Sequence, residues 1–202
     1  MMVRRAPAAR AAAAMLLTAA LLVPCGALAA DAPAVTHYGL DPAKSSLEFT
    51  FMQAGAANKG RFTRFQVAFD FAAENLGASR LDVTIEMSSV DTGDQERDDT
   101  LKGGDLFAVA KFPQAHFAAS QINRTASGYE AVGKLTIRGV TRDARVPFSF
   151  RTATENGAAV GHMSGKTSVR RLDYGVGQGD WKATDQVGND VAVSLTLRLI
   201  AH

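Results

Sequence analysis

The chain has 202 residues and a mass of 21.3 kDa, which suits one ordinary domain and is short for two. Hydrophobic residues make up 47% of the sequence and charged residues 21%, a composition that excludes global disorder and a protein embedded wholly in a membrane. Basic residues outnumber acidic ones by 22 to 20, and this small excess comes from the N-terminal segment.

The first 29 residues have the three parts of an export signal. These parts are a basic start (Arg4, Arg5 and Arg10), an apolar run (11–23) and an A-x-A cleavage site (27–29). The apolar run is too short for a transmembrane helix, which needs about 20 residues, although an N-terminal membrane anchor is the alternative interpretation. We expect residues 1–29 to be a cleaved signal peptide, exported by the general or the twin-arginine route, and residues 30–202 to form a single domain without a membrane segment.

Removal of the signal peptide changes the charge and the thiol content of the chain. Three arginines leave with it, so that 19 basic residues face 20 acidic ones, and a nucleic-acid partner loses its electrostatic support. The only cysteine, Cys25, leaves as well. The mature chain therefore has neither a disulfide nor thiol chemistry, and its stability must come from a hydrophobic core.

Apolar and polar residues alternate with a period of two through most of the remaining chain, which is the signature of half-buried strands. The clearest runs lie at 46–52, 61–71, 80–88, 128–138, 146–150 and 191–199, and weaker runs lie at 115–122 and 159–170. Short segments rich in Gly and Asn separate most of these runs, which favours antiparallel neighbours. The pattern predicts about eight strands.

One long interruption, residues 91–113, breaks the alternation. Residues 94–102 are polar and predict a short surface helix that stops at Gly103 and Gly104, and a second helical turn is expected over 106–111. The strands themselves fit either a sandwich or a closed barrel. Their length and the removal of sheet edges by closure favour the barrel. An eight-stranded barrel is either filled by side chains or holds one small ligand, and the pattern leaves both open.

The polar residues of the chain predict no metal site and no catalytic machinery. The four histidines, His37, His116, His162 and His202, lack the spacing of metal ligands. The tripeptide Asp91-Thr92-Gly93 occurs in aspartic proteases, but that chemistry needs two such carboxylates and the chain has one copy. We therefore interpret Asp91 and Gly93 as turn formers and expect a protein that is not an enzyme.

Several ordered segments resemble the YceI-like family of exported polyisoprenoid-binding proteins. They are 38–49 (YGLDPAKSSLEF), 60–65 (GRFTRF), 89–93 (SVDTG), 96–98 (ERD), 105–107 (DLF), 111–113 (KFP) and 133–141 (GKLTIRGVT). The resemblance extends over about 36–200. It implies an all-β, lipocalin-like barrel of eight antiparallel strands, with a short helical insertion around 94–111. It also implies a periplasmic location and an apolar cavity for an isoprenoid, such as a polyprenyl lipid or a quinone tail.

The ligand expected from the resemblance is an apolar long-chain lipid, with no cofactor, no metal, no nucleic-acid partner and a homodimer left open. The family supplies no shared catalytic residues. The rival hypothesis is a structural or stress-related barrel with a dry core and no bound lipid. Combining the resemblance with the strand alternation gives the expected cavity lining: Phe49, Phe51, Phe65, Phe69, Leu81, Val83, Ile85, Phe117, Leu135, Ile137, Phe148, Leu195 and Leu197.

Overall fold

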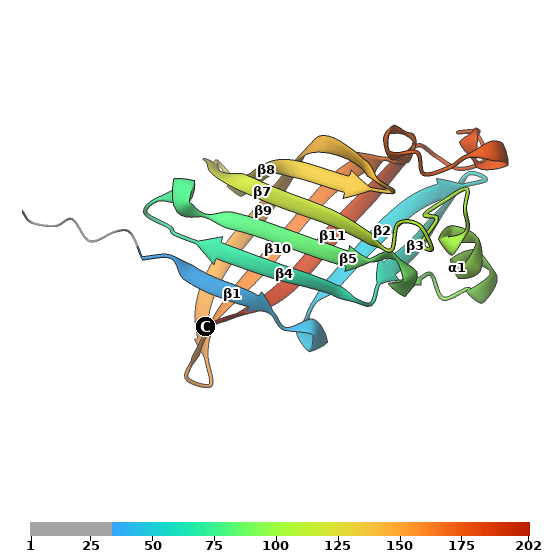
Figure 1. The fold of residues 1–202 in the computed structure, drawn as a ribbon. Helices are drawn as coiled ribbons and strands as arrows, with labels where there is room; N and C mark the ends of the chain where they lie inside the picture. Colours follow the sequence, from blue (N-terminus) through green and yellow to red (C-terminus); the bar gives the residue numbers. More distant parts are fainter. Residues whose placement is uncertain (1–33) are drawn as a thin grey trace, which may run out of the picture. The chain divides into compact units, whose positions relative to one another are not determined.

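The alternating strands form one antiparallel sheet in the computed structural model, which describes residues 34–202 (Figure 1). In chain order the strands are β1 (Thr36–Leu40), β2 (Ser46–Gln53), β3 (Ala56–Phe62), β4 (Phe65–Phe71), β5 (Arg80–Glu86), β6 (Val90–Asp91), β7 (Gln114–Thr125), β8 (Gly128–Ile137), β9 (Val140–Glu155), β10 (Ala158–Arg170) and β11 (Asp190–Ala201). The predicted signal peptide, residues 1–29, lies outside the described residues.

The sheet closes on itself as a barrel with eight strand places. The closed ring runs β1-β4-β5-β7-β8-β9-β10-β11 and returns to β1. The three remaining strands continue three of these places: β2 follows β1 along β11, β3 pairs with β2, and β6 pairs with β3. The predicted eight-stranded antiparallel barrel is thus confirmed, with its first three places each built from two short strands.

The run 61–71, predicted as one strand, is interrupted at Thr63 and Arg64. Ser89, which is buried, causes the interruption because it takes over backbone bonds that a neighbouring strand would make. The Thr63 N–H donates to the Ser89 carbonyl at 3.1 Å, and the Arg64 N–H donates to the Ser89 hydroxyl, also at 3.1 Å. A 3-10 turn at Met87–Ser89 places this serine and separates β5 from β6.

The one α-helix within residues 34–202, α1 (Gln95–Lys102), lies where the sequence predicts it. The Asp94 side chain caps its N-terminus by accepting from the Arg97 N–H at 3.1 Å, and Gly103 follows its last residue. The second helical turn expected over 106–111 is wrong. Ala108, which has a φ of 49°, directs the chain into hydrogen-bonded turns there, and its own N–H donates to the Gly103 carbonyl.

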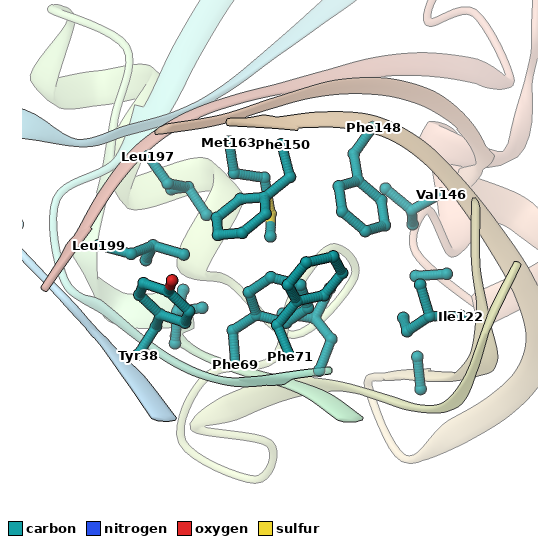
Figure 2. Close-up of a cluster of buried hydrophobic side chains, with 14 of the residues drawn as sticks. Tyr38, Phe69, Phe71, Ile122, Val146, Phe148, Phe150, Met163, Leu197 and Leu199 are labelled. Carbon is teal, nitrogen blue, oxygen red and sulfur yellow. The ribbon is translucent and has the colours of Figure 1, made fainter. Parts of the chain in front are cut away.

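Side chains from opposite walls fill one end of the barrel (Figure 2). Phe69 on β4 is completely buried and meets Phe150 on β9 edge-on, with ring centroids 5.0 Å apart. Phe148 and Phe71 extend this aromatic cluster on the same two strands. The C-terminus lies at this end, whereas α1 and the loops before β11 lie at the other (Figure 1). The two ends of the barrel therefore differ, and only one is densely packed.

Candidate ligand-binding cavity

The end of the barrel near α1 contains an apolar cavity of about 430 Å³. Its wall is built from inward-facing residues of β2, β5, β7, β8, β9, β10 and β11, because alternate residues of each strand point to the same face. Protein interiors are normally packed as densely as organic crystals, so an unfilled space of this size is suited to a ligand. Small-molecule sites typically measure about 300–1,000 Å³.

Nine of the residues predicted to line the cavity do line it. They are Phe49, Phe51, Leu81, Val83, Ile85, Phe117, Leu135, Ile137 and Leu195. Phe69, Phe148 and Leu197 point into the barrel but belong to the packed end. Phe65 lines a separate hollow at the break between β3 and β4. That any of these residues contacts a ligand stays a prediction.

The loops at this end of the barrel complete the lining, and the sequence reasoning missed them. Leu101, Leu106 and Phe107 come from α1 and the turns after it, and Tyr174, Val176, Trp181 and Val187 come from the segment between β10 and β11. These residues lie outside the strand alternation. Their signal in the sequence is only that large apolar residues occur in otherwise polar loops. Val191 and Val193 also line the cavity, and continuing the alternation of β11 would have found them.

The buried guanidinium of Arg171 holds the loop that closes the cavity. Arg171 is 5% exposed and lines the cavity. It donates hydrogen bonds only to backbone carbonyls, of Val187 at 2.7 Å, Val176 at 3.0 Å, Gly188 at 3.0 Å and Ala183 at 3.5 Å. Burial lowers the pKa of Arg171 because it disfavours the charged form.

Polar side chains line part of the cavity beside α1. Asp94, Glu96 and Arg97 come from the start of the helix. Arg97 lies 3.7 Å from Asp94, so the carboxylate of Glu96 leaves this edge with an excess of negative charge. The cavity thus offers an apolar interior and a polar, mildly acidic edge.

A second hollow, of about 600 Å³, lies on the barrel wall at the break between β3 and β4. Leu47, Glu48 and Phe62 line both this hollow and the cavity, so only a thin layer of side chains separates them. Two arginines border the hollow, and each is paired: Arg61 with Asp91 at 2.7 Å and Arg64 with Glu86 at 2.6 Å. Neither arginine therefore offers an unpaired positive charge to this hollow.

Three histidines and Asp91 of the Asp91-Thr92-Gly93 tripeptide form ion pairs with neighbouring side chains. His37, His116 and His162 each pair with one carboxylate at 2.7–2.8 Å on the outer surface. Within residues 34–202, no group of three or more His, Cys, Asp or Glu side chains is placed to hold a metal ion. The Arg61 guanidinium, with the Gly93 backbone N–H, holds the pKa of Asp91 below its usual value.

In the part of the chain from residue 34 onward, no helix has both the length and the apolar character needed to cross a bilayer.

Comparison with known structures gives several relatives of the same fold. BcnA of Burkholderia cenocepacia superposes with a TM-score of 0.72, is 32% identical in sequence, and the match covers 79% of this chain and 98% of BcnA. A YceI protein of Campylobacter jejuni gives a TM-score of 0.65 at 24% identity, covering 72% of this chain and 85% of that protein. A polyisoprenoid binding domain from Saccharophagus degradans, implicated in plant cell wall breakdown, gives 0.58 at 17% identity, covering 82% and 98%. The two less similar structures show the fold alone.

Comparison of sequences agrees with this result. A UPF0312 protein of Yersinia pestis is 41% identical over 83 residues, which are 41% of this chain and 43% of the relative. The chain thus matches less than half the length of these curated relatives. The model of the YceI-like domain matches residues 38–199, nearly the whole barrel. The chain belongs to the family of proteins with a YceI-like domain.

Proposed function

We propose that the protein binds an isoprenoid lipid, such as a polyprenyl chain or a quinone tail, in the cavity of about 430 Å³ and sequesters or carries it. The observation that carries the proposal is the unfilled apolar space inside a barrel whose other end is densely packed. Burying a prenyl chain there would contribute up to ~0.8 kcal/mol for each CH₂ removed from water, before the costs of ordering and association.

The family supports the isoprenoid as the ligand class. A related barrel from Saccharophagus degradans is named a polyisoprenoid binding domain, and the sequence of this chain resembles exported members of the same family. A linear isoprenoid has no charge along its tail, which suits walls built from Phe, Leu, Ile and Val. The proposed role is binding without catalysis.

The proposal extends to export and domain organisation. We propose that residues 1–29 are removed during export to the periplasm and that residues 30–202 work as one binding domain. The basic start, the short apolar run and the A-x-A sequence support this processing. An exported carrier would meet membrane lipids outside the cytoplasm, where an apolar chain needs shielding from water.

Trp181 gives a direct test of binding because it lines the cavity and is the only tryptophan of the chain. Farnesol, a short prenyl alcohol, should change the emission of Trp181 in a saturable way. Native mass spectrometry of the freshly purified, unmodified protein should show a co-purifying apolar ligand or one farnesol bound per chain. An oligoethylene glycol of similar mass, which is polar and has no prenyl chain, serves as the negative control.

Absence of binding would favour the rival hypothesis. If neither a co-purified lipid nor farnesol uptake is found by either method, the protein is better described as a structural barrel without a lipid. A Trp181→Phe variant should still bind farnesol by mass spectrometry. That result would show that Trp181 reports on binding and is not required for it.

A further inference from the structure

Three loops come together at the end of the barrel that holds the cavity (Figure 1). They are the turns after α1 (103–108), the two-residue turn between β8 and β9 (138–139) and the segment after β10 (171–178). Each loop, or the residue directly before it, contributes to the cavity lining through Leu106, Phe107, Ile137, Tyr174 and Val176. Three of these side chains pack as one buried cluster: Leu106, Tyr174 and Val176. The loops therefore cover this end of the cavity.

Backbone hydrogen bonds join the turns after α1 to the segment after β10. The Asp105 carbonyl accepts from the Gly177 N–H at 2.9 Å and from the Gln178 N–H at 2.8 Å. Both bonds run between the two loops, so both break when the loops separate. The exchange of these two amide protons with solvent therefore reports on opening at this end of the barrel.

The side chain of Arg138 bridges the same two loops from the turn between β8 and β9. Its Nη2 donates to the Gly104 carbonyl at 2.6 Å, and its Nη1 donates to the Gly175 carbonyl at 2.8 Å. The rigid fork of a guanidinium lets one side chain reach two carbonyls at once. In the described part of the chain, the cavity lining does not include Arg138 itself. Arg138 thus ties three loops together without facing a ligand.

The backbone at Arg138 shows that the arginine is kept there at a conformational cost. Arg138 and Gly139 have φ values of 50° and 74°, and Ile137 pairs with Val140 across them. Positive φ at both central residues of a two-residue hairpin turn is the pattern of type I′ turns, which favour asparagine followed by glycine. An arginine at positive φ is uncommon, so its contribution at this position comes from the side chain.

The bonds of Arg138 are suited to opening as well as to closing. Its Nε is buried without a hydrogen-bond partner among residues 34–202. When the loops separate, water can reach this nitrogen and offset part of the loss of the other two bonds. The Gly175 carbonyl also accepts from the Gln178 side-chain amide at 2.9 Å, so it keeps a partner. Releasing Arg138 therefore leaves few polar groups unsatisfied.

We propose that Arg138 is a latch that controls how fast a ligand enters and leaves the cavity. The inference rests on the proposed lipid-binding function and adds its gating. Separation of the loops carries Leu106, Tyr174 and Val176 away from one another and opens a path for an apolar chain. The latch closes in the same way over an empty and a filled cavity. It therefore slows entry and exit by the same factor and leaves the affinity unchanged.

The first test measures the two rates separately on the purified protein. Stopped-flow mixing with farnesol, followed by the emission of Trp181, gives the association rate. Mixing the loaded protein with an excess of phosphatidylcholine vesicles, which take up released farnesol, gives the dissociation rate. Arg138→Asn removes the guanidinium and supplies the residue that the turn favours, so the melting temperature should change little. We expect both rates to rise on the order of tenfold and Kd to change less than about threefold.

Arg142→Asn is the matched control for the kinetic test. Arg142 is exposed on β9, and its Nε donates to the carbonyl of a single loop residue, Asp173, at 3.2 Å. It joins no second loop through a listed carbonyl on the α1 side of the cavity. Its replacement should leave both rates unchanged, which separates the bridge between loops from the general loss of an arginine.

The second test needs no ligand. Hydrogen exchange followed by NMR should show the amide protons of Gly177 and Gln178 exchanging on the order of tenfold faster in Arg138→Asn than in the unmodified protein. The Val176 N–H donates to the Arg171 carbonyl at 3.0 Å within one loop. Its exchange should stay the same, because separation of the loops does not break that bond.

The outcomes separate the latch from the proposed function. If the unmodified protein binds no prenyl alcohol, the proposed function fails, and the amide protons alone decide whether Arg138 holds the loops together. If farnesol binds but Arg138→Asn changes neither rate, or speeds only dissociation so that affinity falls, the latch is overturned while the proposed function stands. Unchanged exchange at Gly177 and Gln178 overturns the latch in either case.

Discussion

The Nη2 atom of Arg171 donates a hydrogen bond to the carbonyl oxygen of Val187 at 2.7 Å, and both residues line the same cavity. One buried cation thus connects the end of β10 to the loop that precedes β11. Gly177 lies so close to the guanidinium that a Cβ there would stand 1.8 Å from Nη1, and its φ of 108° also favours glycine. The loop that closes the cavity is ordered around this side chain.

Replacing Arg171 with methionine should destabilise the barrel and loosen the closing loop. The carbonyls of Val176 and Val187 would lose their donors while remaining shielded from water, and hydrogen bonds to charged groups contribute about 1.5–3 kcal/mol each without being additive. We expect a loss of about 3 kcal/mol in the free energy of unfolding, measured by urea denaturation. Arg170→Met is the matched control, since Arg170 is exposed and lies 3.9 Å from Asp173. Equal effects of the two substitutions would contradict the role of Arg171.

Leu135→Trp should abolish prenyl binding without unfolding the protein. Leu135 lines the cavity, so the larger side chain occupies space that the protein's own packing leaves free. Leu199→Trp makes the same change in the packed end, where Leu199 is completely buried, and overpacking there should cost about 1–3 kcal/mol. Melting temperature and uptake of a prenyl probe are measured for both. A lowered melting temperature for Leu135→Trp, with no uptake by the unmodified protein, would favour a dry core.

The barrel could be predicted from the sequence because its long strands alternate strictly. Residues 128–138 and 191–199 became β8 and β11 almost at the predicted bounds, since each strand buries one face. The strand β3 was missed over residues 56–60, where the sequence AANKG carries no apolar alternation. Its pairing with β2 follows from a tight turn in which Ala54 and Gly55 have positive φ, a local turn geometry that the hydrophobic periodicity does not reveal.

The cavity could be predicted only in part, because alternation shows which face points inward and not how far the interior is filled. Phe69 and Phe117 both point inward on neighbouring walls, yet Phe69 belongs to the packed end and Phe117 also lines the cavity. The difference depends on side chains that meet across the barrel from strands far apart in sequence. The contribution of Trp181 likewise depends on where a long loop folds back, which its local sequence does not determine.

Asp91→Asn should leave prenyl binding unchanged, and no catalytic activity should depend on the Asp91 carboxylate. Asp91 accepts hydrogen bonds from Arg61 Nε at 2.9 Å and Nη2 at 2.7 Å, which joins β3 to β6 on the barrel surface. An asparagine keeps the size and one acceptor oxygen, so only the attachment of β6 weakens. Binding of farnesol and cleavage of a general peptide substrate are measured side by side. A peptidase activity that disappears in the variant would show that the protein is an enzyme.

Export should remove the first part of the chain. The predicted cleavage lies between Ala29 and Asp31, so Edman sequencing of protein recovered from the periplasm should begin at Ala30 or Asp31. Ala29→Lys, which places a large charged residue at the cleavage site, should slow processing and leave a longer precursor in the membrane fraction. Mature protein that retains residues 1–29 would instead support the N-terminal membrane anchor.

The ion pair between Arg64 and Glu86 should make the stability of the barrel depend on acid pH. Arg64 and Ser88 hydrogen-bond to the carboxylate and lower the pKa of Glu86 to about 2, below its usual value near 4.3 in an unfolded chain. A group with a lowered pKa in the folded state stabilises it fully above the unfolded value and loses this contribution as the pH falls through the folded value.

The stability that Glu86 adds should therefore be present at neutral pH and disappear between about pH 4.5 and pH 2. Glu86→Gln should unfold at lower urea concentration than the unmodified protein near pH 6, and the two midpoints should converge near pH 2. The difference should be small and should shrink in high salt, because both side chains are exposed to solvent. Glu74→Gln, at an exposed turn position, is the control. A difference that persists unchanged at pH 2 would mean that the glutamine disturbs packing and that the ion pair does not stabilise the fold.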